Sequence, residues 1–191
     1  MHVQTIPKSP PKIIVQVAKS CDFFFALIKY KIENIMKIKI IALGKIKEKF
    51  LKSGIDEFLK RLTPYAQIYV VEINPIEIKD ENLKDKILIQ EGEKILSNIK
   101  PTDFVITMEI LGKEFSSEEF AQKIEELTNS GTQEIVFVIG SSCGIGKNVS
   151  QRANLKMSMC KMTFLHEFAR LILVEQLYRA FKIIRGETYH K

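Results

Sequence analysis

The sequence predicts an α/β protein built on a mainly parallel sheet that is flanked by helices. Short apolar runs alternate along the chain with segments of helical spacing. Most of these helical segments are a dozen residues or longer, the length that a crossover between parallel strands needs. The most apolar run ends in a glycine-rich turn, a common feature of the ligand-binding edge of such sheets. With 191 residues, 46% of them hydrophobic, the chain can bury a substantial core.

The individual elements follow from apolar periodicity and from the residues that interrupt it. The expected strands are residues 37–43, 68–73, 104–110, 134–139 and 155–159. The expected helices are residues 48–62, 84–99, 116–129, 147–153 and 166–184. Pro64 and Pro101 stop the first two helices, and Ser116, followed by acidic residues, is a suitable N-cap for the third. The last helix has more apolar positions than one sheet face needs, so part of it is expected to contact a second subunit.

Residues 1–35 differ from the rest of the chain and are interpreted as an N-terminal extension to a domain of residues 36–191. Three prolines cluster at its start, and it ends just before Met36, which opens a clean strand. Two interpretations remain open. The extension is either a disordered tail or misassigned start that precedes the true start at Met36, or a helix that binds a membrane or a partner.

Composition narrows the class of protein. The net charge of +6 favours an anionic partner such as RNA without requiring one. Three widely spaced cysteines, with no CxxC pair and no histidine at zinc-ligand spacing, argue against disulfides and against a metal site, which suits the cytoplasm. No apolar run approaches the roughly 20 residues of a membrane span, and a good secretory signal is lacking.

The turn at residues 140–146 is the expected floor of a pocket. Gly140, Gly144 and Gly146 allow the backbone to come close to a bound molecule, since glycine tolerates positive φ and leaves room. The turn lacks the third glycine of a dinucleotide-binding fingerprint. It also lacks the Ser or Thr of a Walker A loop, because Asn148 follows Lys147. Neither nucleotide-binding motif is supported.

Three candidates for substrate contact lie near the C-terminus, each with an ordinary structural alternative. His166 opens the last helix, where its ring can point into the pocket or can simply cap and pack. Arg170 lies one turn later, among acidic residues that would account for it through intrahelical ion pairs. The segment 185–191 carries an aromatic residue, a histidine and cations, so it can stack on a nucleobase or can be a frayed tail.

From Met36 to Lys191 the chain resembles the RlmH (YbeA-like) group of SPOUT-class methyltransferases. The resemblance rests on blocks spread along the body: residues 40–45 (IIALGK), 91–93 (EGE), 137–140 (FVIG), 173–180 (LVEQLYRA) and 185–191 (RGETYHK). The last two blocks are the most specific. Three positions depart from the usual pattern of the group, which has glycine at Ser141, proline at Leu165 and glutamine at Glu167.

The resemblance implies a C-terminal deep trefoil knot, the SPOUT or α/β-knot fold, which is an exception to the rule that chains avoid knots. It implies that S-adenosylmethionine binds in the knot through backbone groups of three loops. The positions that correspond to these loops are Met108, Gly140, Met159, Cys160, Lys161, Met162, Thr163 and Phe164. No metal is implied.

The activity implied is methylation of N3 of a pseudouridine in 23S rRNA of the assembled ribosome, by a cytoplasmic homodimer. Candidates for the base or cation that assists loss of the N3 proton are His166, Arg170 and His190, the last from the partner subunit. Tyr189 is expected to stack on the base and Arg170 to contact a phosphate or the imidate. Two alternatives remain, a ribosome-binding protein that keeps the knot without catalysis and a SPOUT enzyme that acts on tRNA.

Overall fold

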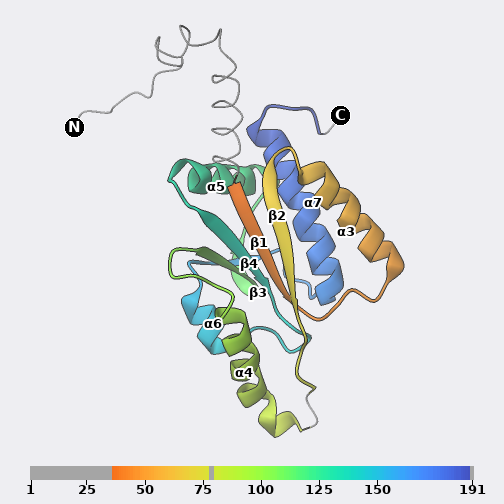
Figure 1. Cartoon of the computed structure of the whole chain (residues 1–191), viewed down its shortest axis with the longest axis vertical. Coiled ribbons are helices and arrows are strands. Elements are labelled where there is room, and N and C mark those ends of the chain that lie inside the picture. The colour runs from red at the N-terminus through yellow and green to blue at the C-terminus, as the bar shows by residue number, and fades with distance from the viewer. Residues whose placement is uncertain (1–35, 78–79, 190–191) are drawn as a thin grey trace, which may run out of the picture. The chain divides into compact units, whose positions relative to one another are not determined.

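The computed structural model describes residues 36–77 and 80–189 (Figure 1). The interpretation of residues 1–35 as an extension, and the role of His190, therefore lie outside the described residues.

Five strands form one sheet in the order β2-β1-β4-β3-β5, and every neighbouring pair is parallel. The strands are β1 (Met36–Leu43), β2 (Ala66–Ile73), β3 (Phe104–Glu114), β4 (Glu134–Ile139) and β5 (Leu155–Ser158). The helices are α3 (Lys49–Leu62), α4 (Lys84–Leu96), α5 (Ser117–Asn129), α6 (Lys147–Arg152) and α7 (His166–Ile184), with a short 3-10 turn, η1 (Glu81–Leu83), before α4. The predicted α/β fold with a parallel sheet is confirmed.

The helices cover both faces of the sheet, so two hydrophobic cores form (Figure 1). One core packs α3, α5 and α7 against strand residues such as Ile38 and Ile40. The other packs α4 and α6 against Ile41 and Val138 on the opposite face. Because strand side chains alternate between faces, β4 at the centre of the sheet is buried along its whole length. This double burial explains its uninterrupted apolar sequence.

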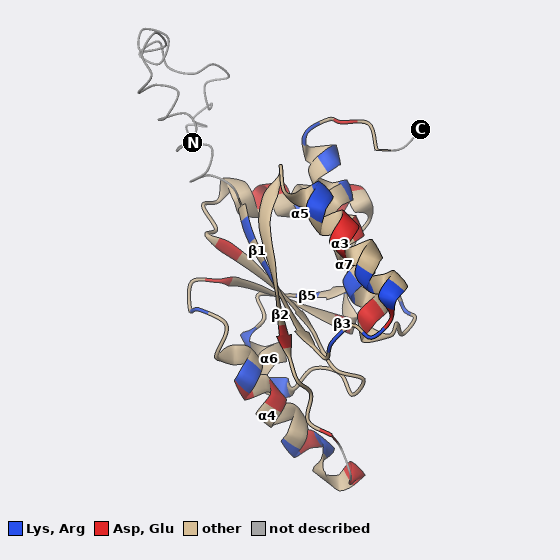
Figure 2. Cartoon of the chain, turned by 45° about the vertical axis from the view of Figure 1, so that its right-hand side comes forward, with Lys and Arg blue, Asp and Glu red and all other residues tan. Residues whose placement is uncertain are grey.

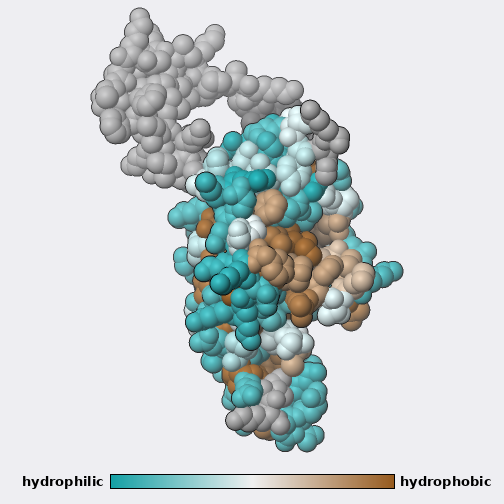
Figure 3. Space-filling model, turned by 90° about the vertical axis from the view of Figure 1, so that its right-hand side faces the viewer, coloured by the Kyte–Doolittle hydropathy of each residue, from teal (hydrophilic) through white to brown (hydrophobic). Residues whose placement is uncertain are grey.

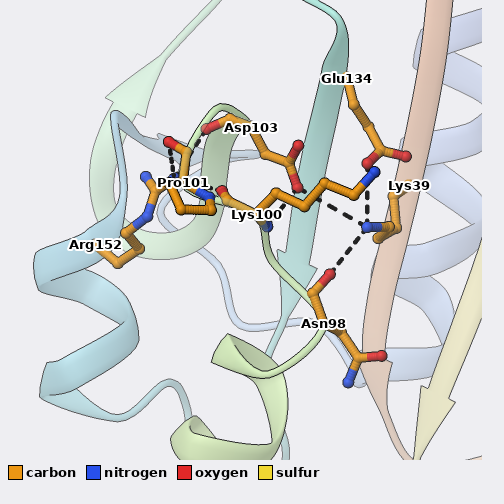
Figure 4. Close-up of polar contacts among 7 residues, drawn as sticks. All are labelled: Lys39, Asn98, Lys100, Pro101, Asp103, Glu134 and Arg152. Atoms are coloured by element: carbon orange, nitrogen blue, oxygen red, sulfur yellow. Dashed lines mark hydrogen bonds and ion pairs between the residues drawn. The ribbon is translucent and has the colours of Figure 1, made fainter.

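The amino-terminal end of the sheet is held by a buried polar cluster (Figure 4). Lys39 Nζ donates to the Asn98 carbonyl at 2.9 Å and lies 3.1 Å from Glu134 Oε2 and 3.9 Å from Asp103 Oδ2. Arg152 donates to the carbonyls of the neighbouring loop that ends at Asp103. A buried lysine needs such partners, because an uncompensated charge in the interior is costly. This end of the sheet therefore has a structural role.

Strand β3 is longer than predicted and breaks its register with β5 between Met108 and Lys113. Gly112 lies after the break, where a Cβ would come within 2.6 Å of the Met157 backbone. The close approach of the two strands thus depends on glycine at this position. The irregular segment turns Glu109 and Ile110 toward the carboxyl end of the sheet, where they line the cavity described below.

Candidate active site

A cavity of about 610 Å³ lies at the carboxyl end of the sheet, between the ends of β3, β4 and β5 and the start of α7. It is within the range of volumes typical of small-molecule sites. Its lining comes from segments far apart in the sequence: Met108, Glu109 and Ile110; Ile139 to Ile145; Met157 to Cys160; and Met162 to His166 with Ala169. The cavity thus forms where the glycine turn predicted a pocket floor.

The turn after β4 depends on glycine. A Cβ at Gly140 would lie 2.3 Å from the carbonyl oxygen of Gly144 and 2.6 Å from its carbonyl carbon. The Gly144 amide donates to the Ser141 carbonyl at 3.0 Å, and Gly144 has a φ of +96°. This φ is in the left-handed region that favours glycine. The two glycines therefore allow the chain to reverse tightly against the cavity.

A buried carboxylate, Glu91 of α4, supports this turn from behind. Glu91 is only 2% exposed, and its Oε1 accepts from the Ile76 amide at 2.8 Å. Its Oε2 accepts from the Ser141 hydroxyl at 3.3 Å, and Ser141 Oγ accepts in turn from the Cys143 amide at 3.3 Å. The side chain of Ser141 is thus engaged with the protein on the side of α4. Glu91, recognised in the sequence only as part of a matching block, ties the turn to the scaffold.

The loop after β5 forms the facing wall of the cavity. Ser158 Oγ donates to the Cys160 carbonyl at 2.9 Å, and the Met162 amide donates to Cys160 Sγ at 3.3 Å. These local bonds shape a loop that has no regular secondary structure. Of the six positions predicted here as cofactor contacts, all line the cavity except Lys161, which is exposed. The other two predicted positions, Met108 and Gly140, also line it.

Glu109 is the single acidic residue in the lining of this cavity. Its two carboxylate oxygens accept from Thr107 Oγ1 at 2.7 Å and from Ser150 Oγ at 3.1 Å. The carboxylate is therefore held in place beside a mostly apolar cavity. Such an arrangement favours a ligand that carries positive charge. The sequence analysis missed Glu109 because the break in strand register that brings it to the cavity has no clear signal in the sequence.

His166 is the substrate-contact candidate that reaches the cavity, which it lines from the first position of α7. Its ring packs on the end of β1, where Gly44 has a φ of +94° and a Cβ would lie 3.0 Å from His166 Nε2. The adjacent Glu167 accepts at Oε2 from the Lys47 amide at 2.9 Å. The start of α7 is therefore fixed against the loop that follows β1.

Arg170 lies one turn further along α7, is fully buried and is not part of the cavity lining. It donates from Nη1 to Glu72 Oε1 of β2 at 2.6 Å and from Nη2 to the Gly44 carbonyl at 2.9 Å. These partners on β2 and after β1 replace the intrahelical ion pairs considered from sequence. A direct contact with substrate stays a prediction, and the observed contacts favour an indirect role in which Arg170 supports Gly44 behind His166.

The chain after α7 folds back on that helix, away from the cavity of the same subunit. Tyr189 donates to Glu175 Oε1 at 2.9 Å, and its ring centroid lies 5.3 Å from that of Tyr178 and 4.5 Å from Arg179 Cζ. Burial, followed by the hydrogen bond to Glu175, raises the pKa of the Tyr189 phenol above its usual value of 10.0. Tyr189 is thus neutral at physiological pH, and the structure does not bring it together with His166.

Glu187 anchors this segment, since it accepts from Tyr65 Oη at 2.8 Å and also pairs with Lys182. The hydrogen bond from Lys182, and then that from Tyr65, lowers the pKa of Glu187 below 4.5. A lowered pKa means that the anchor is fully present above the unfolded-state pKa and is lost as the pH falls through the folded-state pKa. The C-terminal segment should therefore stay held throughout the neutral range.

We expect Glu187→Gln to release this segment at pH 7, because the amide replaces a charge-assisted bond with a weaker one. Hydrogen exchange of residues 185–189, followed by mass spectrometry, should become several-fold faster than in the wild type. The wild type should show constant exchange from pH 6 to 8 after correction for intrinsic rates. Glu125→Gln, an exposed glutamate of α5, is the control. Equal exchange in the two variants would show that Glu187 is not the anchor.

Comparisons with known proteins agree with this fold and cavity. Residues 36–190 match the family described as "Predicted SPOUT methyltransferase". The chain therefore belongs to the SPOUT methyltransferase family. It is also similar to the ribosomal RNA large subunit methyltransferase H of Carboxydothermus hydrogenoformans, with 51% identity over 160 residues that cover 82% of this chain and all of the relative.

Two further searches of the described residues bear on the class of site. They contain no group of three or more histidine, cysteine or acidic side chains that could hold a metal ion. No helix among them is long and apolar enough to cross a membrane.

Proposed function

We propose that this protein transfers a methyl group from S-adenosylmethionine to N3 of a pseudouridine in 23S rRNA within the assembled ribosome. The observation that carries the proposal is the cavity, because seven of the eight positions that the family resemblance marks as cofactor contacts line it. Similarity to an rRNA large subunit methyltransferase along that relative's entire length supports the choice of rRNA. The ribosome as substrate implies action in the cytoplasm.

The cavity suits the proposed cofactor in size, shape and charge. S-adenosylmethionine supplies an electrophilic methyl group on a positively charged sulfonium. The apolar walls suit its adenine and methyl portions, and the fixed carboxylate of Glu109 provides the negative charge that a cationic ligand requires. Gly140 leaves the turn open to backbone contacts, because any side chain there would occupy the space of the Gly144 carbonyl. The deep trefoil knot that the family implies would bring the two loops of this cavity together.

The substrate side of the reaction is assigned to the start of α7 and to the C-terminal segment. His166 lines the cavity and is placed to accept the N3 proton or to stabilise the developing negative charge. Tyr189 and His190 would act on the base from the partner subunit, since Tyr189 lies against its own α7 beside Glu175. Arg170 would act through Gly44, whose carbonyl it binds.

A homodimer would complete this site. Large apolar side chains are exposed at and near the cavity: Ile110, Leu111, Met162, Phe164, Leu165 and Phe168. Leu111 is 99% exposed, and apolar residues also gather on the face shown in Figure 3. Exposed apolar groups at this density are typical of an interface. A second copy that covers them would bring its own C-terminal segment toward the cavity, which is the arrangement that the family implies.

A calorimetric titration with S-adenosylmethionine tests the cofactor assignment and separates the main alternative. We expect saturable binding to the full-length chain, with one cofactor for each cavity that is formed. Absence of binding at millimolar cofactor would favour a ribosome-binding protein without catalysis. Methyl transfer to isolated tRNA, but not to ribosomes, would instead favour the tRNA enzyme.

A further inference from the structure

Positive charge is concentrated where the chain leaves β1 and enters α3. Residues 45–52 contain four lysines, Lys45, Lys47, Lys49 and Lys52, and one acidic residue, Glu48, for a net charge of +3. The whole chain carries +6, of which residues 1–35 carry +3 from five lysines and two acidic residues. Residues 36–191 therefore carry +3, which equals the charge of residues 45–52 alone. The rest of this domain is electrically balanced.

The stability of the fold does not account for these four lysines. All four are exposed, and none of their side chains makes a hydrogen bond or an ion pair with the described part of the chain. Helix α3 begins at Lys49 with no acidic residue in its first turn, and Glu48 provides no side-chain cap. Lysine near a helix N-terminus opposes the helix dipole, which is positive there. The lysines thus raise the local electrostatic energy and favour an external anion.

This basic segment is attached to the wall of the candidate active site. The amides of Lys47 and Glu48 donate to Glu167 Oε2 at 2.9 and 3.5 Å. Glu167 directly follows His166, which lines the cavity. Helices α3 and α7 also pack side by side, and Figure 2 shows Lys and Arg gathered along this part of the molecule. A polyanion bound by the lysines would therefore pass close to the cavity.

We propose that Lys45, Lys47, Lys49 and Lys52 form a surface, here the lysine surface, that binds phosphates of the rRNA next to the nucleotide that enters the cavity. This inference rests on the proposed function and adds a contact region outside the cofactor cavity. RNA fits the surface better than other partners because lysine binds phosphate as a flexible point charge, and four such charges within eight residues match a closely spaced row of phosphates. The small total charge of the domain concentrates this attraction at one place.

The test compares two double variants of the full-length chain that each remove two positive charges from one helix. Lys49→Gln/Lys52→Gln alters the lysine surface, and Lys86→Gln/Lys94→Gln alters exposed, unpaired lysines of α4 as the control. The KM for unmodified ribosomes is measured from 50 to 200 mM salt. Each phosphate contact contributes about 0.7 to 0.9 to the slope of log affinity against log salt. The first variant should therefore lose about 1.5 from this slope, while the control keeps the wild-type slope.

The remaining readouts make the outcome decisive. Cofactor affinity and kcat at saturating ribosome should stay within about twofold of the wild type in both variants, since neither alters the cavity. Equal slopes in the two variants would overturn the lysine surface. So would a loss confined to dimer formation, measured by analytical ultracentrifugation, because the lysines would then contact the partner subunit. If the wild type itself does not methylate ribosomes, the proposed function fails instead, which is a distinguishable result.

Discussion

Replacing Gly140 with alanine is expected to weaken binding of S-adenosylmethionine by about 10- to 100-fold while the chain remains folded. The new Cβ would lie 2.3 Å from a backbone oxygen, which cannot move aside as a side chain can. Rearrangement of such a contact typically costs about 1–3 kcal/mol, and each 1.4 kcal/mol corresponds to a factor of ten in affinity. Because the turn forms one wall of the cavity, its displacement should appear directly in the calorimetric dissociation constant.

Gly54→Ala is the matched control for this experiment. Gly54 lies within α3, and its new Cβ would meet only the flexible end of the Leu171 side chain, at 3.2 Å. Alanine also favours helix more than glycine does, so the fold should be retained. Cofactor affinity should be unchanged in this variant. Equal affinities of the Gly140 and Gly54 variants would contradict the assignment of the glycine turn to the cofactor site.

Arg170→Ala is expected to lower the free energy of unfolding by about 3 kcal/mol. Removing the guanidinium leaves Glu72 and the Gly44 carbonyl without their partner in the core, and breaking a buried ion pair typically costs about 3–5 kcal/mol. The lower end of this range applies because the Glu72 side chain is 35% exposed and can regain solvent. Urea unfolding followed by circular dichroism measures the difference.

Arg61→Ala provides the comparison, since Arg61 pairs with Glu57 in an exposed position. An exposed pair of this kind contributes at most about 1 kcal/mol. A similar stability of the two arginine variants would show that the buried contacts of Arg170 are not structural. In that case its predicted contact with the substrate would become the better explanation of any lost activity.

The strands and helices were predictable because each has a local signal. The capping box at Ser116 and Glu119 is present as the N-cap analysis expected, and the continuous apolar run of β4 reflects burial on both faces. The sheet order was not predictable in this way, since β4 lies between β1 and β3 through long-range pairing. Local sequence patterns define elements, whereas their order in a sheet depends on tertiary packing.

The candidate site shows the same division. The glycine turn marked the cavity because glycine has a direct backbone consequence, and the resemblance to a known family marked the facing loop. The support behind these loops was not predictable. Glu91 looks like a surface residue of a helix rich in lysine and glutamate, and only the packed structure reveals that it is buried beneath Ser141. Arg170 similarly has acidic neighbours along its helix, yet its partner is Glu72 on a distant strand.

The most direct test is methyl transfer from labelled S-adenosylmethionine to ribosomes that lack this modification, followed by mapping of the methylated nucleotide by mass spectrometry. The account predicts label at N3 of a pseudouridine in 23S rRNA, with strong loss of label in the Gly140→Ala variant at limiting cofactor. Absence of label from the wild-type chain at saturating cofactor, or label confined to tRNA, would contradict it.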